Sequence, residues 1–519
     1  MFSLIAEKPF MQGQVQINGD TLTIEDVVKV AYNKAKVVIP EKVKARVKDC
    51  REFLEKLLEE GEVIYGVNTG FGALSDAKIS RRELKQLQTN LIRSHSAGVG
   101  KPLSTEVVRA TMLLRANTLA KGYSGIRLET LETLIEMLNK GVHPIIPEKG
   151  SVGASGDLAP LSHMVLVLMG EGGAEYKGKI MNGKQAMKKA GIKPIQLDFK
   201  EGIALNNGTQ IMTAIAALTV HRAKNLIKTA EIAAALTMEA LLGVSDALDE
   251  KIHNVRPHAG QAATAKNIRE LIAGSKLVQT GKEAMAKIGC PHDPYSLRCT
   301  PQILGAARDA IAYAKKIVEV EMNSATDNPL IFPEAGVCLS GGNFHGQPIA
   351  LAMDTLAIAL TFIGNLSERR ITRLLDEKLN NGLPAFLIPP QAKRGLNSGM
   401  MTAQYTAAAL ASENKILAHP ACADSIPTSA NFEDFVSMGT TAAQKAMQIL
   451  ENTEYITAIE LLCAAQAIEY RGSEKLGKGT KKAYMKVREA VPPIKEDRPL
   501  NPDIEKLKAL VKDGILLRD

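Results

Sequence analysis

Hydrophobic residues in the second half of the chain recur at the spacing of an α-helix. Steps of three and four residues bring side chains onto one helical face, so a repeated pattern of this kind predicts a helix that buries a single stripe. The clearest stripes consist of Met353, Leu356, Leu360 and Ile363 and, further along, of Ala443, Met447 and Leu450. We therefore expect long amphipathic helices in this half of the chain.

Four alanine-rich segments carry this helical character. They are Ile232–Leu248, Pro348–Asp376, Met401–Leu417 and Gly439–Tyr470. Several exceed the average helix length of about 11 residues, and they are rich in alanine on more than one side, which favours membership of a close-packed bundle. The sequence contains no series of alternating strands that could build a large sheet, and no internal repeat.

The N-terminal part of the chain has a different character. Residues 1–200 mix short helical patterns with three glycine-rich loops, at 66–72, 96–102 and 149–160. Loops of this kind frequently hold binding and catalytic residues. We therefore predict a mainly α protein with two domains, a smaller N-terminal domain over residues 1–200 that presents the loops and a long helical bundle over residues 201–519.

Composition narrows the class of function. The 519 residues are 45% hydrophobic and 23% charged, and the net charge of +8 is dispersed along the chain. These values are typical of a globular protein with a sizeable core. Because only 4% of the residues are aromatic and Trp is absent, the surface lacks platforms on which nucleic-acid bases stack. We expect no nucleic-acid partner.

Cysteine usage and hydropathy predict a cytoplasmic location. The six cysteines are scattered without a Cys-X-X-Cys pair, which suits free thiols in a reduced compartment, and no paired His or Cys spacing indicates a metal site. The N-terminus reaches Glu7 and Lys8 before the apolar core of a signal peptide could form. The longest apolar run, Leu356–Gly364, covers half a bilayer, so we expect no membrane partner.

Two glycine-rich strings approach phosphate-binding motifs without matching them. Residues 472–480, GSEKLGKGT, have the glycine and lysine spacing of a P-loop, but Gly479 replaces the hydroxyl residue and a helical pattern precedes the string. Residues 70–75, GFGALS, lack the third glycine of a dinucleotide-binding fingerprint. Neither string predicts a nucleotide site.

The most informative segment is GSVGASGDLAPLSH. Ala154, Ser155 and Gly156 lie in a loop that should end at the start of a helix, with Asp157 as its cap and Pro160 in its first turn. On these residues alone the segment is a tight, glycine-rich turn before a helix.

In its full length the segment resembles the signature of the aromatic amino acid ammonia-lyase family. In that family the Ala-Ser-Gly triad cyclises: the glycine nitrogen attacks the alanine carbonyl, two waters are lost, and an electrophilic 4-methylideneimidazole-5-one group remains. The resemblance implies that Ala154, Ser155 and Gly156 form this prosthetic group and that no external cofactor is needed. A covalent electrophile of this kind divides the difficult expulsion of ammonia into easier steps.

Further blocks of the same family follow in order between residues 65 and 438. By resemblance, Tyr65 in YGVNTGFG is the catalytic base, Asn207 in EGIALNNGTQ contacts the substrate, and Phe344 in SGGNFHGQP lines the pocket. The block PYSLRCTPQ supplies Tyr295 as a further catalytic residue and Arg298, whose planar fork suits a substrate carboxylate. Outside the family pattern each would be an ordinary structural residue.

The dyad Ser94–His95 in NLIRSHSAGVG is associated with substrate choice, and it resembles the form found in histidine-specific members of the family. A neutral histidine exchanges hydrogen bonds with a substrate imidazole, whose nitrogens an apolar pocket would leave unsatisfied. The segment SENKILAHPACADSIPTSAN also resembles those members and implies that Glu413 lies near the substrate ring, where a carboxylate fixes the tautomer. By themselves, His95 could be structural and Glu413 a surface partner of lysines.

Three positions depart from the histidine-specific pattern. His292, which we keep as a substrate-binding candidate, stands where those members typically have Gln, and Phe432 and Phe435 in NFEDFVSM replace Gln and His. The added aromatic surface suits a phenyl or phenol ring. A tyrosine or phenylalanine ammonia-lyase, or a 2,3-aminomutase that returns the amine to the β-carbon, therefore stays open as the alternative.

Taken together, the resemblance implies a homotetramer that converts L-histidine to trans-urocanate and ammonia, with active sites that draw residues from three subunits. From a different class of function, the helical part alone would suit a non-catalytic scaffold. The intact triad at Ala154, Ser155 and Gly156 argues against a scaffold.

Overall fold

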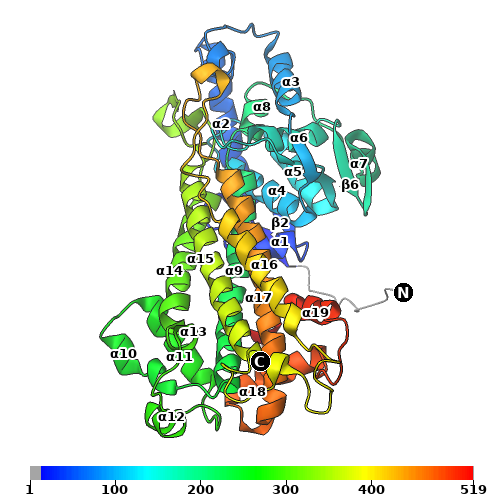
Figure 1. The fold of residues 1–519 in the computed structure, drawn as a ribbon. Coiled ribbons are helices and arrows are strands. Elements are labelled where there is room, and N and C mark those ends of the chain that lie inside the picture. Colours follow the sequence, from blue (N-terminus) through cyan, green and yellow to red (C-terminus); the bar gives the residue numbers. More distant parts are fainter. Residues whose placement is uncertain (1–12, 518–519) are drawn as a thin grey trace. The chain divides into compact units, whose positions relative to one another are not determined.

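The computed structural model describes residues 13–517. These residues form nineteen α-helices and nine strands of three or four residues each. The mainly helical fold that the sequence predicts is confirmed (Figure 1).

The chain divides into two compact units that the prediction of one boundary near residue 200 does not describe. The first unit comprises the described residues up to His221, Lys315–Met353 and Pro420–Gln444, and the second comprises Arg222–Ala314, Asp354–His419 and the described residues from Lys445 onward. The chain passes from one unit to the other at five points. Four of these points lie inside helices, namely α9 (Gln210–Ala240), α14 (Thr300–Met322), α15 (Gln347–Leu375) and α17 (Gly439–Arg471). Since no loop interrupts the helical pattern at these four points, the sequence carries no signal for the boundaries between the units.

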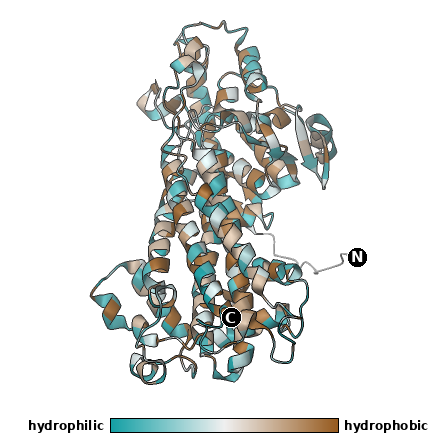
Figure 2. Ribbon diagram, viewed as in Figure 1, coloured by the Kyte–Doolittle hydropathy of each residue, from teal (hydrophilic) through white to brown (hydrophobic). Residues whose placement is uncertain are grey.

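The second unit is a bundle of long helices. It contains the corresponding parts of α9, α14, α15 and α17 together with α16 (Met401–Leu417) (Figure 1). Hydrophobic residues of these helices are interspersed with hydrophilic ones (Figure 2). Shorter helices complete the unit: α10 (Glu250–Asn254), α11 (Ala259–Leu271), α12 (Gly281–Ile288), α13 (Tyr295–Arg298), α18 (Lys478–Ala490) and α19 (Asn501–Lys512).

A buried carboxylate joins three helices of this bundle. Glu460 on α17 accepts hydrogen bonds from Nε and Nη2 of Arg370 on α15, at 2.6 and 2.8 Å, and both side chains are completely buried. Ser367 on α15 and Thr237 on α9 donate to the same carboxylate at 2.6 and 2.8 Å. Because a buried charge is tolerated only when it is paired and hydrogen-bonded, these contacts set the register of the three helices.

Two helices differ from the sequence prediction, and three, α15, α16 and α17, match it closely. The segment predicted over Ile232–Leu248 is the end of α9, which stops at Ala240 because Leu242 has a φ of +55° and Gly243 follows. The sequence analysis did not identify α14. By contrast, α15 spans nearly the predicted range, and although it is long and apolar enough to cross a membrane, 72% of its most apolar stretch is buried, as in the core of a protein.

The first unit combines the helices α1 to α8 with four small sheets. Its helices are α1 (Ile24–Ala31), α2 (Glu41–Glu59), α3 (Leu84–His95), α4 (Thr105–Ala120), α5 (Leu128–Lys140), α6 (Leu158–Leu168), α7 (Gly183–Ala190) and α8 (Glu201–Asn206). The sheets pair β1 (Gln14–Gln16) with β2 (Lys36–Val38), β3 (Val99–Pro102) with β5 (Pro147–Lys149), β4 (Val142–Pro144) with β6 (Gly173–Tyr176) and β7 (Lys179–Asn182), and β8 (Leu330–Phe332) with β9 (Val337–Leu339). Only β1 and β2 are parallel among these described pairs.

The Ala-Ser-Gly triad lies in the loop between β5 and α6, where two glycines touch. Gly156 has a φ of +69°, and a Cβ added to it would collide with the backbone of Gly208. Gly208 cannot carry a side chain either, because its Cβ would collide with Arg115 and with the Thr326 carbonyl oxygen. Arg115 is completely buried on α4 and donates to the carbonyl oxygens of Asn207, at 2.9 Å, and Thr326, at 3.2 Å.

Asp157 occupies the predicted cap position of α6, but its carboxylate does not cap that helix. Its Oδ2 accepts the backbone N–H groups of Ile211 and Met212, at 2.9 and 3.0 Å, in the first turn of α9. Its Oδ1 accepts hydrogen bonds from the hydroxyls of Ser151, at 2.9 Å, and Thr440. The triad loop is therefore tied to the start of another helix, which the local sequence pattern does not show.

We predict that Gly208→Ala destabilises the protein more than Gly178→Ala does. Gly178 has a φ of +73° and open space around the position of a Cβ, so its substitution should cost only about 1–2 kcal/mol for the left-handed backbone. Gly208→Ala should lower the free energy of unfolding by about 1–3 kcal/mol more, because its methyl group overpacks against Arg115. Thermal and denaturant unfolding of both variants measures the difference, and equal losses would contradict the close approach described here.

Candidate active site

A cavity of about 950 Å³ opens in the first unit beside the triad loop. Seven of the residues predicted from the sequence line it: Tyr65, Ser94, His95, Ala154, Ser155, Asn207 and Phe344. Gly156 packs behind the loop against Gly208 and does not line the cavity. Segments far apart in the sequence thus meet around the triad.

Ser155 is the member of the triad that presents a polar group to this cavity. Ala154 is 4% exposed and Gly156 is buried, whereas Ser155 is half-buried. The Ser155 hydroxyl donates to Oε1 of Glu433 at 2.7 Å. A carboxylate therefore lies at the serine side chain of the triad, and the sequence analysis did not single out this residue.

Glu433 is held by a strained turn. Its backbone pairs with that of Thr428 at 2.9 and 3.3 Å, and the Thr428 hydroxyl donates to Oε2 of Glu433 at 2.9 Å. The intervening residues Ser429, Ala430 and Asn431 have φ values of +52°, +52° and +65°. Left-handed backbone costs about 1–2 kcal/mol for each residue with a Cβ, and such strain gathers at functional sites.

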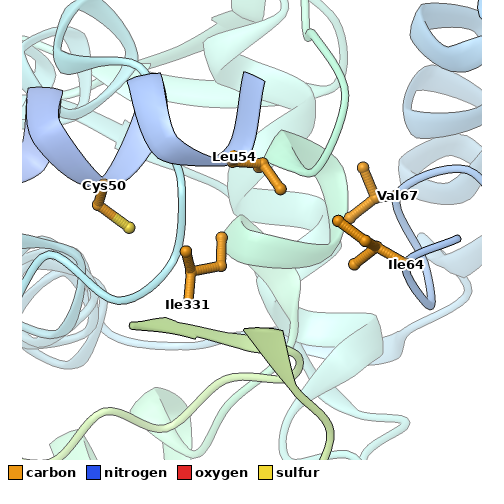
Figure 3. Packing of buried hydrophobic residues seen from close by; sticks show 5 residues of the cluster. All are labelled: Cys50, Leu54, Ile64, Val67 and Ile331. Carbon is orange, nitrogen blue, oxygen red and sulfur yellow. The ribbon is translucent and has the colours of Figure 1, made fainter. Parts of the chain in front are cut away.

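Tyr65 lies in a turn that a hydrophobic cluster anchors on both sides. Ile64 and Val67 pack with Leu54 and Cys50 of α2 and with Ile331 of β8 (Figure 3). The Tyr65 hydroxyl oxygen accepts the backbone N–H of Gly72 at 3.0 Å. The turn and this hydrogen bond together fix where the phenol oxygen lies.

Ser94 and His95 form a hydrogen-bonded pair at the end of α3. The Ser94 hydroxyl donates to the Leu91 carbonyl at 3.1 Å, and its oxygen lies 3.0 Å from Nδ1 of His95. The hydroxyl proton is thus engaged, so Nδ1 carries a proton and donates, and Nε2 is left as an acceptor. Burial lowers the pKa of His95, while the nearby Leu91 carbonyl and Glu433 carboxylate oppose this shift.

Asn207 lines the cavity and has an unpaired side-chain acceptor. Its Nδ2 donates to the Asn328 carbonyl at 3.3 Å and to Asp327 at 3.5 Å, and Asp327 forms a completely buried ion pair with Lys200 at 2.7 Å. Its Oδ1 is buried and has no hydrogen-bond partner among residues 13–517. Since unsatisfied buried polar atoms are costly, this oxygen is suited to accept a hydrogen bond from a bound molecule.

Four predicted residues belong to the second unit and do not line this cavity. His292 and Glu413 are exposed, and Tyr295 is 69% exposed on α13, with the Arg298 guanidinium 5.1 Å from the centre of its ring. Their roles remain predictions. The carboxylates that line the cavity are Glu433 and Asp434, and Glu413 is not among its lining residues. The sequence signal for them is the acidic pair Glu433–Asp434 between the two phenylalanines of NFEDFVSM.

The lining of the cavity also includes four phenylalanines. Phe71, Phe344, Phe432 and Phe435 all line it. The Phe435 ring stacks on His345 with centroids 6.2 Å apart, and Nε2 of His345 lies 3.1 Å from the Phe435 carbonyl oxygen. No lining residue in the described part of the chain is Lys or Arg, and no cluster of three or more potential metal ligands occurs in residues 13–517.

Comparison with known proteins agrees with this architecture. The family model described as aromatic amino acid lyase matches residues 22–489. A protein named histidine ammonia-lyase from Caldanaerobacter subterraneus subsp. tengcongensis is 56% identical over 501 residues, which cover 96% of this chain and 97% of that protein.

Two solved structures extend the agreement to the fold. Histidine ammonia-lyase from Trypanosoma cruzi is 42% identical, with a TM-score of 0.89 and coverage of 97% of this chain and 94% of that chain. Tyrosine aminomutase from Streptomyces globisporus is 41% identical, with a TM-score of 0.93 and coverage of 97% and 98%. The chain therefore belongs to the aromatic amino acid lyase family and is a carbon–nitrogen lyase.

Proposed function

We propose that this enzyme converts L-histidine to trans-urocanate and ammonia with a 4-methylideneimidazole-5-one group made from its own chain. The observation that carries the proposal is the placement of Ser155 on a cavity that Tyr65, His95 and Glu433 also line. The relatives named histidine ammonia-lyase support the choice of substrate. The predictions of a cytoplasmic enzyme without nucleic-acid or membrane partners stand as part of this proposal.

The residues around the triad fit the prosthetic group. Ala154 and Gly156 are enclosed, Gly153 and Gly156 have φ values of +72° and +69° that bend the loop, and Ser155 faces the cavity. Ring closure would join the Gly156 nitrogen to the Ala154 carbonyl carbon and release two waters, one of them from the Ser155 side chain. When formed, the group supplies an electrophile that captures the substrate and lets ammonia leave.

Tyr65 is suited to take the β-proton. Its hydroxyl lines the cavity, and the Gly72 N–H that donates to the oxygen keeps it in place. Fixed positioning of a proton acceptor is the main requirement for general base catalysis. The free Oδ1 of Asn207 is placed to accept a hydrogen bond from the bound amino acid.

His95 and Glu433 supply two different hydrogen-bonding groups for an imidazole. The lowered pKa of His95 keeps its ring neutral near pH 7, so its Nε2 accepts an N–H from the substrate. Glu433 offers carboxylate oxygens, which are an alternative acceptor because a neutral substrate imidazole has a single N–H. A phenyl ring would leave Nε2 of His95 without a donor, which disfavours phenylalanine.

The substrate carboxylate requires a cation that the described cavity wall does not contain. Glu433 and Asp434 make the wall acidic. We infer that Arg298 of a neighbouring subunit binds this carboxylate and that Tyr295 approaches with it, in a homotetramer. The exposure of Tyr295 on the single chain supports this.

An apolar surface on the bundle is available for such assembly. On α16 the exposed residues Tyr405, Ala409, Ser412 and Ile416 share one face, and Ile358 is exposed on α15. Tyr405 is 59% and Ile416 74% exposed in the single chain. Large exposed apolar residues that share a helix face are typical of a subunit interface.

The second candidate function is a lyase or 2,3-aminomutase that acts on tyrosine or phenylalanine. The observation that favours it is the aromatic wall formed by Phe71, Phe344, Phe432 and Phe435. The tyrosine aminomutase with a similar fold shows that the scaffold also occurs in an enzyme with that name.

We predict that the purified enzyme forms urocanate and ammonia from L-histidine and little product from L-tyrosine or L-phenylalanine. Ultraviolet absorbance of the conjugated acids, with ammonia assayed in parallel, measures each reaction.

The intact mass should be lower than the sequence mass by two waters. Ser155→Ala should abolish turnover, keep the fold and show no such loss, and cinnamate or coumarate as the main product would favour the second candidate.

We also predict that Glu433→Gln and Glu413→Gln separate the two candidate carboxylates. Glu433→Gln should lower kcat/KM for histidine by about 10²-fold or more, because a charged hydrogen-bond acceptor near the reacting groups is lost. Glu413→Gln should lower kcat/KM less than Glu433→Gln does, because the carboxylate that contacts Ser155 is that of Glu433. The reverse ranking would return Glu413 to the ring-binding role implied by resemblance.

For assembly, we predict that the protein sediments as a tetramer and that the double variant Ile358→Glu, Ile416→Glu sediments as smaller species with reduced activity. A charge buried at an apolar interface has no partner there. Ile180→Glu, on the exposed strand β7 of the first unit, serves as the control. Unchanged sedimentation of the double variant would exclude this face from the interface.

A further inference from the structure

The segment that follows His95 runs beside the segment that leads into the triad. Gly98 precedes β3, Gly150 follows β5, and these two strands pair with Val99 opposite Lys149. A Cβ added to Gly150 would lie 3.1 Å from Cα of Gly98. The substrate-binding dyad and the triad are thus carried by neighbouring stretches of backbone.

His163 holds these two stretches together. It lies on α6, the helix that starts directly after the triad, and its Nε2 accepts the backbone N–H of Gly98 at 3.1 Å. Its ring packs on Gly98, where an added Cβ would lie 3.2 Å from Nε2 and 3.3 Å from Cδ2. His163 does not line the cavity, so it can act on a bound substrate only through the backbone.

Few other contacts restrain the backbone between His95 and β3. The Ala97 N–H donates to the His95 carbonyl at 2.8 Å, and the Ser96 hydroxyl donates to the Ile92 carbonyl at 2.7 Å. Both partners belong to α3 itself. The hydrogen bond between Gly98 and His163 therefore differs from these two, because it connects the segment after α3 to the helix that follows the triad.

We propose that His163 is a positioning residue that sets the distance between the Ser94–His95 dyad and the triad by holding the Gly98 N–H. This inference rests on the proposed function in one respect, the contact of the dyad with the substrate ring. If it is correct, His163 determines how well the substrate ring is held, while formation of the prosthetic group at Ser155 does not require it.

The hydrogen bond requires a neutral His163. An Nε2 that accepts carries no proton, so uptake of a proton there would set two N–H groups against each other. The titratable groups on elements packed against α6 are Lys85, Arg93 and His95 on α3, Glu148 and Lys149 on β5, Lys184, Lys188 and Lys189 on α7, Glu201 on α8 and His143 on β4. Burial alone lowers the pKa of His163 below its usual 6.5.

The direction of the pH effect follows from that lowered pKa. The fold favours neutral His163, so the contribution of this contact to stability is present above pH 6.5 and is lost as the pH falls below it, through the lower pKa of the folded state. Substrate binding by the wild-type enzyme should weaken over the same range, because the dyad is then held less well.

The test compares His163→Gln, whose amide oxygen can accept the Gly98 N–H, with His163→Leu, which has no acceptor. The Leu variant should show an unchanged mass loss of two waters, a KM for histidine raised about fivefold to tenfold for one lost hydrogen bond, and a kcat that changes less. Hydrogen exchange over residues 94–99 should become faster by a similar factor. In the Gln variant, KM and the rate of hydrogen exchange should return to the wild-type values. Its KM should no longer rise at acid pH, because the glutamine amide does not take up a proton as His163 does.

A matched control is available in His143, a buried histidine on β4 whose pKa is lowered to about 4 and whose Nε2 contacts Arg109 at 3.1 Å. His143→Leu should reduce stability without changing KM or the exchange of residues 94–99.

Equal exchange in wild type and His163→Leu, or failure of Gln to restore it, would overturn the proposal. If the Leu variant does not fold, the pH dependence of KM in the wild type and in His163→Gln tests the proposal instead, and equal profiles would overturn it. A wild-type enzyme inactive on histidine would refute the proposed function while the exchange comparison still tests His163.

Discussion

The site depends on one buried carboxylate. Asp157 follows the triad directly, is completely inaccessible to solvent, and accepts two backbone N–H groups at the start of α9 and the hydroxyl of Thr440 at the start of α17. The positive end of a helix dipole offsets part of the cost of burying this charge. Burial raises the pKa of Asp157, while these hydrogen bonds oppose the rise. Three helices therefore start around one anion, and the triad loop has little freedom to move.

Polar and aromatic residues both line the cavity. His95 and Glu433 provide an imidazole and a carboxylate, and the phenylalanines provide apolar surface. Under the proposed function, an N–H of the substrate ring pairs with the polar groups, and the aromatic side chains pack on the ring. The backbone next to His95 then affects substrate binding, because it places the His95 side chain.

The glycine-rich string at residues 472–480 shows why a short motif needs its surroundings. The Gly477 N–H at the start of α18 donates to Oε1 of Glu239 at 2.7 Å, and burial raises the pKa of this carboxyl. A side-chain carboxylate thus occupies the position that an anion would take at a helix N-terminus. The missing hydroxyl residue already excluded a P-loop, and the structure adds a physical reason.

The sequence by itself determined the helical class, the position of the triad and seven of the residues that line the cavity. Helical stripes and loop glycines are local patterns, and the signature around Ser155 is long enough to be specific. Tertiary structure alone decided that the Asp157 carboxylate binds α9 instead of α6, that Glu433 lies at Ser155, and that His163 meets Gly98. The partners of the last two contacts are 278 and 65 residues apart. No local pattern encodes such pairs, because they form only when packed helices bring distant backbone together.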